Sequence, residues 1–217
     1  MTPRFFLFDF DGTITSADTM LCFIRYACGK RRFLLGFALF SPLILLMKLH
    51  LYANWRVKQQ IFSWFFRGMK LTEFDDVCRR FAADNKYLIR PDAYKKLDEL
   101  FLWNQTIAIV TASIENWVIP FFDELRVDSD SDFRVIGTKI EVDGDGRLTG
   151  RFLTFNCYGY EKLRRVMAEF PIIGESRLKC DIVAYGDSRG DRELLAYAHT
   201  SFYRYFNKWN TPPDRKK

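Results

Sequence analysis

Apolar residues follow two different patterns along this chain. Short, unbroken apolar runs occupy residues 5–8, 106–110 and 182–185, and each run ends in polar or turn-forming residues. Runs of this kind are typical of strands that are buried on both faces of a parallel sheet. The first two runs are separated by about ninety residues with helical character. We therefore predict an α/β fold whose parallel-sheet core contains an inserted helical segment.

The inserted segment is predicted to form consecutive helices. Asp18 can cap the first helix, Gly29 can end it, and the last helix begins with Pro91, which suits the first turn of a helix. The predicted helices cover residues 19–28, 33–47, 55–67, 72–86 and 91–103.

Beyond the second run, strands and helices alternate again. We expect a helix up to about residue 125, a strand over 133–136, a hairpin of 139–142 with 147–152, a helix over 160–170, and a short helix before a last strand over 201–205. This pattern assigns residues 1–15 and 105–217 to a Rossmann-like core and residues 16–104 to a helical cap. The polar, basic tail 207–217 is expected to fray.

Three predicted strands end in residues that can carry chemistry. Asp9 and Asp11 follow the first strand, Thr111 follows the second, and Asp187 and Asp191 follow the third. The carboxyl ends of parallel strands lie along one edge of a sheet, so we expect these side chains to lie close together. Carboxylates as close as those of Asp9 and Asp11 repel each other unless a cation or a shared proton relieves them. The pattern predicts a Mg²⁺ site.

One carboxylate of such a site is left to act as a nucleophile. Lys162 would add an ammonium group and Thr111 a hydroxyl group. Phosphoryl transfer through an aspartyl-phosphate requires such a set, because the nucleophile needs a nearby cation to approach a phosphate dianion. The equatorial phosphate oxygens need positive charge and hydrogen-bond donors. The residues therefore favour a Mg²⁺-dependent phosphomonoester hydrolase.

The same residues resemble the four motifs of the haloacid dehalogenase superfamily. These motifs are Asp-Phe-Asp-Gly-Thr at 9–13, Thr111, Lys162, and Gly-Asp-Ser-Arg-Gly-Asp at 186–191. The helical insertion resembles the cap of the phosphoserine-phosphatase-like branch, and residues 150–162 are also similar to that branch. The resemblance covers nearly the whole chain, and it implies a Rossmann-like core with a helical cap.

The resemblance also implies a role for each motif residue. Asp9 would be the nucleophile, and Asp11 would protonate the leaving oxygen and then activate water. Mg²⁺ would be held by Asp9, Asp187 and the backbone carbonyl of Asp11, while Asp191 would support the metal shell or orient Lys162. Thr111 and Lys162 complete the expected catalytic set. The expected substrate-binding residues are Gly12, Thr13, Asp18, Arg56, Ala112 and Ser113.

Each of these residues also has a purely structural interpretation. Thr111 can simply end a strand, Lys162 can be a solvated helix residue, and Asp187 and Asp191 can form a turn and a helix cap. Their coincidence at the ends of predicted strands argues against these interpretations. Asp18 lies where phosphoserine phosphatases carry a substrate-contacting glutamate, and helix capping explains it equally well.

Composition and charge limit the class of protein and the kinds of partner to be expected. The chain has 217 residues, of which 48% are hydrophobic, 28% charged and 17% aromatic, as expected of a globular protein rich in aromatic residues. The net charge of +6 favours an anionic substrate or surface. No recognisable nucleic-acid-binding module is present, so no nucleic-acid partner is expected. Arg56 and Lys58 of the cap can face the substrate or lie on the surface.

The cysteines and the start of the chain favour the cytoplasm. Five scattered cysteines without a CxxC pair suit reduced thiols better than disulfides or a zinc site. The chain runs directly into a strand, so no cleavable signal peptide is expected. We expect a cytoplasmic protein, with peripheral attachment to the inner face of the membrane as an option. The sequence carries no signal for an oligomeric state.

Residues 33–47 bear on the choice of substrate. They contain no charged residue, yet a helix of this length spans only about 22 Å, less than the roughly 30 Å of a bilayer core. A single crossing would also place Asp9 and Thr111 on opposite sides of the membrane. The segment therefore packs inside the cap or against a partner subunit, re-enters the membrane from one side, or lies on anionic lipid through residues 30–48, with Lys30, Arg31 and Arg32 at its start.

Two substrate classes follow. An amphiphilic or lipid phosphomonoester is the leading hypothesis, because some members of this branch act on phosphatidylglycerophosphate-type lipids and carry an apolar cap stretch. Phosphoserine is the alternative, although Asp18 replaces the expected glutamate. A membrane-docked binding protein without catalysis is a third hypothesis. The carboxylate cluster argues against it, because binding alone does not require such repulsion.

Overall fold

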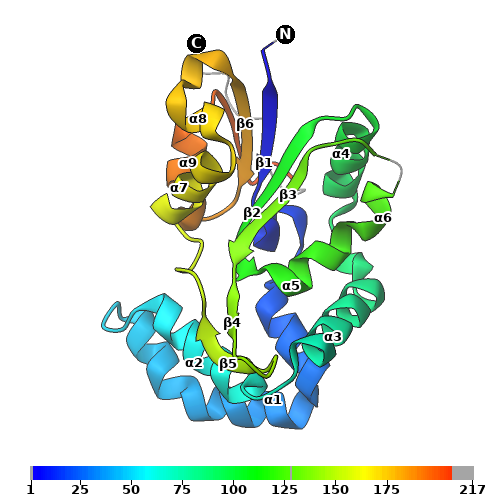
Figure 1. Cartoon of the computed structure of the whole chain (residues 1–217). Helices are drawn as coiled ribbons and strands as arrows, with labels where there is room; N and C mark the ends of the chain where they lie inside the picture. The colour runs from blue at the N-terminus through cyan, green and yellow to red at the C-terminus, as the bar shows by residue number, and fades with distance from the viewer. Residues whose placement is uncertain (1, 128, 207–217) are drawn as a thin grey trace.

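The core of the molecule is a parallel sheet. The computed structural model describes residues 2–127 and 129–206, so the predicted tail 207–217 lies outside the described residues. Within the described residues, five strands follow the spatial order β3-β2-β1-β6-β7 (Figure 1). Every neighbouring pair is parallel, which confirms the predicted α/β class. The strands are β1 (Arg4–Phe8), β2 (Thr106–Ile114), β3 (Phe133–Thr138), β6 (Asp181–Gly186) and β7 (Thr200–Tyr203).

The register of the central strands aligns their carboxyl ends. Phe8, the last residue of β1, pairs with Ile109 of β2 and with Tyr185 of β6. The residues that follow each pairing position therefore reach the same edge of the sheet. Because successive side chains on a strand point to opposite faces, both faces of β1 need cover. Its last four residues are buried, in agreement with their unbroken apolar run.

Helices cover both faces of the sheet. On one face, Phe5 and Leu7 pack with helices α7 (Tyr160–Glu169), α8 (Pro171–Glu175) and α9 (Arg192–Tyr197). On the other face, Phe6 and Phe8 belong to a cluster that includes α4 (Pro91–Leu102), α5 (Glu115–Val118) and α6 (Asp123–Arg126). Short turns complete the core: the π-helical turn η1 (Phe10–Ile14) and the 3₁₀ turns η2 (Lys86–Leu88), η3 (Ile119–Phe122), η4 (Arg177–Lys179) and η5 (Arg189–Asp191).

The cap lies beyond the carboxyl edge of the sheet (Figure 1). It contains α1 (Thr19–Lys48), α2 (Asn54–Phe66) and α3 (Leu71–Asp84). The ring of Phe23 makes edge-on contacts with the rings of Phe74 and Phe81, which joins α1 to α3. Gly29 interrupts α1 with a φ of 75°, so the predicted end of the first helix is a kink after which the helix continues. Among the described helices, none combines the length and the hydropathy that a membrane crossing requires.

Two elements group differently in space than in the sequence. The ring of Phe101 in α4 contacts Phe133 of β3, so the last predicted cap helix packs on the core sheet. The hairpin of β4 (Ile140–Val142) and β5 (Leu148–Phe152) instead packs against α2 of the cap. The division into a core of 1–15 and 105–217 and a cap of 16–104 stays a prediction.

Some predicted boundaries differ from the observed ones. The helix expected up to about 125 is divided into α5, η3 and α6, because Pro120 lies at the start of η3 and has no N–H to donate. The second strand extends beyond 110, since Ile114 still pairs with Thr138 of β3. Helix α8 was not expected, although Pro171 at its start is a helix signal.

Candidate active site

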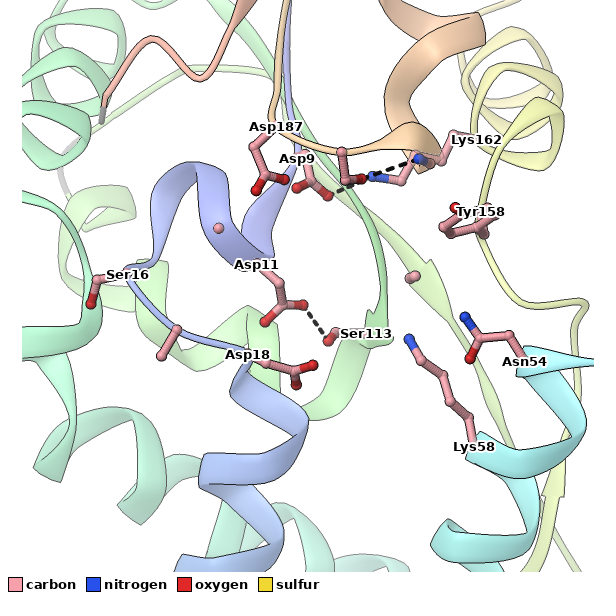
Figure 2. A pocket seen from close by; sticks show the side chains of 15 residues that line it. Asp9, Asp11, Ser16, Asp18, Asn54, Lys58, Ser113, Tyr158, Lys162 and Asp187 are labelled. Atoms are coloured by element: carbon pink, nitrogen blue, oxygen red, sulfur yellow. Dashed lines mark hydrogen bonds and ion pairs between the residues drawn. The ribbon is translucent and has the colours of Figure 1, made fainter. Parts of the chain in front are cut away.

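A cavity of about 370 Å³ opens between the carboxyl edge of the sheet and the cap (Figure 2). The segment between β1 and α1, the end of β2, helices α2 and α7, and the loops after β5 and β6 all contribute to it. Its lining residues are Asp9, Asp11, Gly12, Ser16, Ala17, Asp18, Asn54, Lys58, Ala112, Ser113, Tyr158, Lys162, Asp187, Ser188 and Gly190.

A buried cation joins two of the carboxylates. Lys162 Nζ donates to Asp9 Oδ1 over 2.5 Å and to Asp191 Oδ1 over 2.6 Å, and only 2% of the Lys162 side chain is exposed. The other oxygen of Asp9 accepts a hydrogen bond from Thr13 Oγ1 at 3.2 Å. Three chain segments more than twenty residues apart thus converge on one charge cluster. The ion pair holds the Asp9 carboxylate in a fixed orientation at the floor of the cavity.

Burial and charge shift the ionisation of this cluster. Burial raises the pKa of Asp9 to about 7, with Asp191 and Asp11 adding to the effect and Lys162 opposing it. Burial alone would lower the pKa of Lys162, but the carboxylates of Asp9 and Asp191 outweigh burial and raise this pKa. Burial would raise the pKa of Asp191, and Lys162 instead holds it below its usual value. Lys162 and Asp191 therefore stay charged near neutral pH, and Asp9 is the group that can exchange its proton.

Asp187 provides the oxygen that best fits a metal ion. Its Oδ1 atom is buried and has no hydrogen-bond partner among the described residues. Such an atom is costly unless a ligand satisfies it. Oxygens of Asp9, Asp187 and Asp191 lie within 4.8 Å of one another. Carboxylate oxygens at this spacing are the ligands that Mg²⁺ prefers, so the residues present fit a magnesium ion.

Asp191 differs from the other members of this group. Its Oδ1 accepts from Lys162, and its Oδ2 accepts from the backbone N–H groups of Asp187 and Ser188 and from the Ser188 hydroxyl. Both of its oxygens are therefore engaged within the protein. Asp191 is placed to orient Lys162 and the loop that carries Asp187. The oxygens of Asp187 and Asp9 accept fewer hydrogen bonds and are the better candidates for binding a metal ion.

Gly12 allows the Asp-Gly turn to approach Asp187. Its φ is +82°, and a Cβ atom at this position would lie 2.3 Å from Asp187 Oδ2. A side chain here would therefore collide with the carboxylate that fits the metal. The backbone conformation also belongs to the left-handed region, which favours glycine.

Asp11 is held from two sides. Its Oδ1 accepts from the backbone N–H of Thr19 at 2.7 Å and from Thr19 Oγ1 at 2.6 Å. Its Oδ2 accepts from Ser113 Oγ at 2.6 Å, as Figure 2 shows. These bonds tie the carboxylate to the first turn of α1 and to the end of β2. Asp11 therefore sits at the junction of cap and core, in the wall of the cavity.

The cap contributes an acid and a base to the cavity. Asp18 caps α1, because its Oδ1 accepts from Met20 N at 3.0 Å and from Leu21 N at 3.3 Å, and it also lines the cavity. Both interpretations of Asp18 are thus compatible with its position. Burial raises the pKa of Asp18, as does Asp11, while nearby Lys58 lowers it. In Figure 2 the Lys58 side chain rises into the cavity from α2.

Four predicted site residues do not line the cavity, namely Thr13, Thr111, Asp191 and Arg56. Thr111 is fully buried, and its Oγ1 accepts from the backbone N–H of Ser113 at 3.0 Å. Arg56 is exposed and stacks on the ring of Trp55. Their expected roles in catalysis and substrate binding stay predictions.

The structure adds Asn54, Ser16 and Tyr158 to the residues expected from the sequence, and it brings Lys58, whose position the sequence left open, into the cavity. Asn54 and Lys58 lie four residues apart and therefore share a face at the start of α2. Tyr158 and Ser16 enter from the loops before α7 and α1. Thr19 does not line the cavity but donates two hydrogen bonds to Asp11. The i, i+4 spacing of Asn54 and Lys58 was a usable signal, whereas nothing local marked Tyr158.

The fold and this constellation agree with a family comparison. A model described as haloacid dehalogenase-like hydrolase matches residues 6–196. The chain therefore belongs to the haloacid dehalogenase-like hydrolases, and the superfamily expected from its motifs is confirmed. Protein CicA of Caulobacter vibrioides, found in two strains, is 31% identical over 205 residues, which cover 94% of this chain and 87% of that protein.

Solved structures show the same fold. A crystal structure from Bordetella pertussis Tohama I, described as a protein with unknown function, has a TM-score of 0.74 and 19% identity, over 93% of this chain and 89% of that chain. A substrate-bound phosphoserine phosphatase complex has a TM-score of 0.63 and 16% identity, over 94% of this chain and 86% of that chain. The likeness shows that this chain shares the fold of these structures.

Proposed function

We propose that the protein is a Mg²⁺-dependent phosphomonoester hydrolase that acts through an aspartyl-phosphate on Asp9. The observation that carries this proposal is the buried Asp9–Lys162–Asp191 cluster beside the unpartnered oxygen of Asp187. A carboxylate that is fixed by a cation and faces an open cavity is suited to attack a phosphorus atom. A purely structural cluster would have no use for the unsatisfied oxygen of Asp187.

The reaction takes two displacement steps. A carboxylate oxygen of Asp9 forms a bond to phosphorus, the bond from phosphorus to the leaving oxygen breaks, and Asp11 gives its proton to that oxygen. Water then attacks the phosphorus of the aspartyl-phosphate, Asp11 takes a proton from the water, and inorganic phosphate leaves while Asp9 is regenerated. The Ser113 hydroxyl can accept as well as donate, so it accommodates Asp11 with and without its proton.

Positive charge around the phosphate comes from two sources. Lys162 neutralises Asp9 during the approach of the dianion and can stabilise the equatorial oxygens. Asp9, Asp187 and the backbone carbonyl of Asp11 would hold Mg²⁺, with Asp191 behind them. When bound, Mg²⁺ supplies charge neutralisation between the nucleophile and the phosphoryl group.

An amphiphilic or lipid phosphomonoester is the substrate that we favour. A narrow apolar recess adjoins the catalytic cavity and shares Lys58, Ala112 and Ser113 with it. Its other walls are apolar apart from the unpartnered indole N–H of Trp117. The free volume is about 10 Å³, so apolar atoms of a substrate could enter only after a flexible side chain such as Met20 moves. The proposal includes contact of residues 30–48 with the inner face of a membrane.

Phosphoserine is a second candidate, and one observation favours it. Asp18 and Lys58 bring opposite charges into the same cavity. A carboxylate and an ammonium group could pair with the amino and carboxylate groups of a small zwitterion. The likeness to a phosphoserine phosphatase fold agrees with this candidate. A lipid phosphate would use Lys58 alone and leave Asp18 as a helix cap.

The test is phosphate release from a substrate panel, with Mg²⁺ and with EDTA. The panel contains p-nitrophenyl phosphate, phosphoserine, a lysophosphatidate and phosphatidylglycerophosphate. Mg²⁺-dependent turnover that favours the lipids would support the leading proposal, and a preference for phosphoserine would support the second candidate. Turnover that persists in EDTA would contradict the metal requirement. No turnover of any substrate would favour the binding protein without catalysis.

A further inference from the structure

The second half of α1 presents an apolar surface to the outside of the molecule. We call this surface the outer leucine face, and its side chains are between 38% and 69% exposed. It consists of Leu34, Leu35, Leu39, Leu45, Leu46 and Leu49. Residues 33–47 include no charged residue that could interrupt it. Contiguous apolar patches of this kind are rare on soluble proteins unless another surface covers them.

The opposite side of the same helix is already packed. Phe33, Phe37 and Phe40 contact the cap core, and Gly36 lies directly against α2. A Cβ atom at Gly36 would lie 2.5 Å from a ring atom of Phe65, so the helices approach closely at this point. Arg32 donates to the backbone carbonyl of Phe65 at 3.1 Å and fixes the start of the segment. The outer leucine face is therefore held outward and cannot rotate into the cap.

The charged residues of the segment that carries this face have a single sign. Residues 19–72 contain nine of the 33 Lys and Arg residues of the chain and none of its 27 Asp and Glu residues. The rest of the chain carries 24 basic residues against the 27 acidic ones, so this part of the cap accounts for the whole positive excess. Lys30, Arg31 and Lys48 are exposed at the two ends of the outer leucine face. An apolar strip between cations matches a surface of acyl chains and anionic headgroups.

A second copy of the chain fits this face less well. A two-fold contact places the same patch of both copies together. The cations of one copy would then meet the cations of the other, with no acidic residue in 19–72 to compensate them. Like charges placed at one interface disfavour association. Anionic lipid removes this repulsion.

We propose that the outer leucine face docks in the plane of an anionic bilayer surface, with Lys30, Arg31 and Lys48 at the level of the headgroups. This inference rests on the proposed function only for its consequence in catalysis. Leu51 is 72% exposed and continues the apolar surface past the end of α1. Only two residues separate it from Asn54, which lines the catalytic cavity. Docking thus brings the mouth of the site close to phosphate groups at the lipid surface.

The test compares vesicle binding of matched variants. Sedimentation with vesicles of phosphatidylcholine, with and without phosphatidylglycerol, measures binding directly. The variant Leu35→Ser/Leu39→Ser/Leu46→Ser is expected to bind the anionic vesicles more than about a hundredfold more weakly, from the lost burial of three leucines. The control Leu102→Ser/Leu178→Ser removes apolar side chains that are 78% and 93% exposed elsewhere. It is expected to bind like the unmodified protein.

A charge variant separates the two contributions. Lys30→Gln/Arg31→Gln/Lys48→Gln is expected to weaken binding about fivefold for each cation removed. Added salt should weaken the binding of the unmodified protein to anionic vesicles, and it should have less effect on the binding of this variant. Equal binding of the unmodified protein to vesicles with and without phosphatidylglycerol would overturn the anionic part of the inference.

Two further readouts keep the outcomes distinct. Turnover of dissolved p-nitrophenyl phosphate should be the same for all three variants and the unmodified protein, because none of the changes touches the cavity. Vesicle binding without any turnover would contradict the proposed function and leave docking intact. Turnover without vesicle binding would overturn docking. A dimer that forms with rising concentration, and that the leucine variant abolishes, would assign the face to a second copy.

Discussion

Two regions depart from the normal distribution of polar and apolar groups. The carboxyl edge of the sheet, which we call the catalytic edge, buries charged groups, whereas the outer leucine face of the cap exposes apolar ones. At the edge, Lys162 and Asp191 are almost completely buried, and a buried oxygen of Asp187 has no hydrogen-bond partner in residues 2–127 and 129–206. On the face, leucines lie exposed with no charged residue among them. Burying charge and exposing apolar area both cost free energy.

The free-energy cost of burying charge and that of exposing apolar area are compensated to different extents. The ion pairs of Lys162 offset most of the cost at the catalytic edge, and the remaining oxygen of Asp187 fits a cation. Nothing in the described part of the chain covers the outer leucine face. We therefore propose a partner for each region, a metal ion with a phosphate in one case and a lipid surface in the other. The predictions below test whether the two regions are separable.

The largest effect is expected at the proposed nucleophile, Asp9. Asp9→Asn keeps the shape of the side chain and removes its nucleophilic oxygen, so phosphatase activity should fall on the order of 10⁴-fold or more. Phosphate release from p-nitrophenyl phosphate measures the loss, and circular dichroism checks that the variant is folded. Vesicle binding should not change. Full activity in a folded Asp9→Asn protein would disprove the mechanism.

Loss of the buried cation should be the next largest effect. Lys162→Met leaves Asp9 and Asp191 buried without their partner, which is expected to lower the free energy of unfolding by about 3–5 kcal/mol. Urea denaturation followed by circular dichroism measures the change. Lys179→Met is the control, because Lys179 is exposed, and it should change stability by less than about 0.5 kcal/mol. Equal stability of both variants would show that the ion pairs contribute little.

The two sides of α1 should respond differently to truncation. Phe65 is buried against α1, and Phe65→Ala is expected to cost about 3–5 kcal/mol of unfolding free energy. Leu39 is 61% exposed, and Leu39→Ala should stay within about 0.5 kcal/mol in the absence of lipid. Urea denaturation of both variants provides the comparison. A large loss for Leu39→Ala would mean that the outer leucine face is packed in solution.

A smaller effect is expected where cap and core meet. Ser113→Ala removes the hydroxyl that donates to Asp11 at 2.6 Å. A hydrogen bond to a charged group contributes about 1.5–3 kcal/mol, so kcat should fall roughly ten- to a hundredfold. In the proposed mechanism Asp11 acts as acid and base, so the pH profile of kcat should shift as well. Ser16→Ala, which removes the Ser16–Leu88 hydrogen bond in the same cavity, is the control. An unchanged pH profile would mean that Ser113 does not position Asp11.

The smallest effect concerns pH. Burial raises the pKa of Asp9 to about 7 in the metal-free protein, and a protonated carboxyl group cannot bind a cation. Mg²⁺ affinity should therefore be constant well above pH 7 and fall as the pH drops through 7, by at most about tenfold per pH unit. Calorimetric titration at several pH values measures this slope and the proton released. In Asp9→Asn the slope should largely disappear, and its persistence would assign the proton to another group.

Much of the catalytic edge could be predicted from local sequence. An apolar run before Asp9 and Asp11 indicates a buried strand with carboxylates at its end, and two further runs predict neighbouring strands. The sheet order and register then bring these ends together as expected. What could not be predicted was which oxygen remains free. That depends on contacts between distant segments, such as Lys162 with Asp9 and Ser113 with Asp11.

The cap shows the limit of the sequence more clearly. Residues 33–47 are apolar all round, so their pattern determined a helix but no inner side, and an interior, a partner subunit and a lipid surface fitted equally well. The tertiary structure decided which side is packed, because the close approach of Gly36 to Phe65 selects that side and leaves the leucines outside. In the same way, the sequence offered Arg56 and Lys58 as cap cations, and only the packing of α2 placed Lys58 in the cavity. Local sequence determines which segments are helices, strands and strand ends, since these follow from residue spacing. The side that each helix buries is decided by the surface it meets.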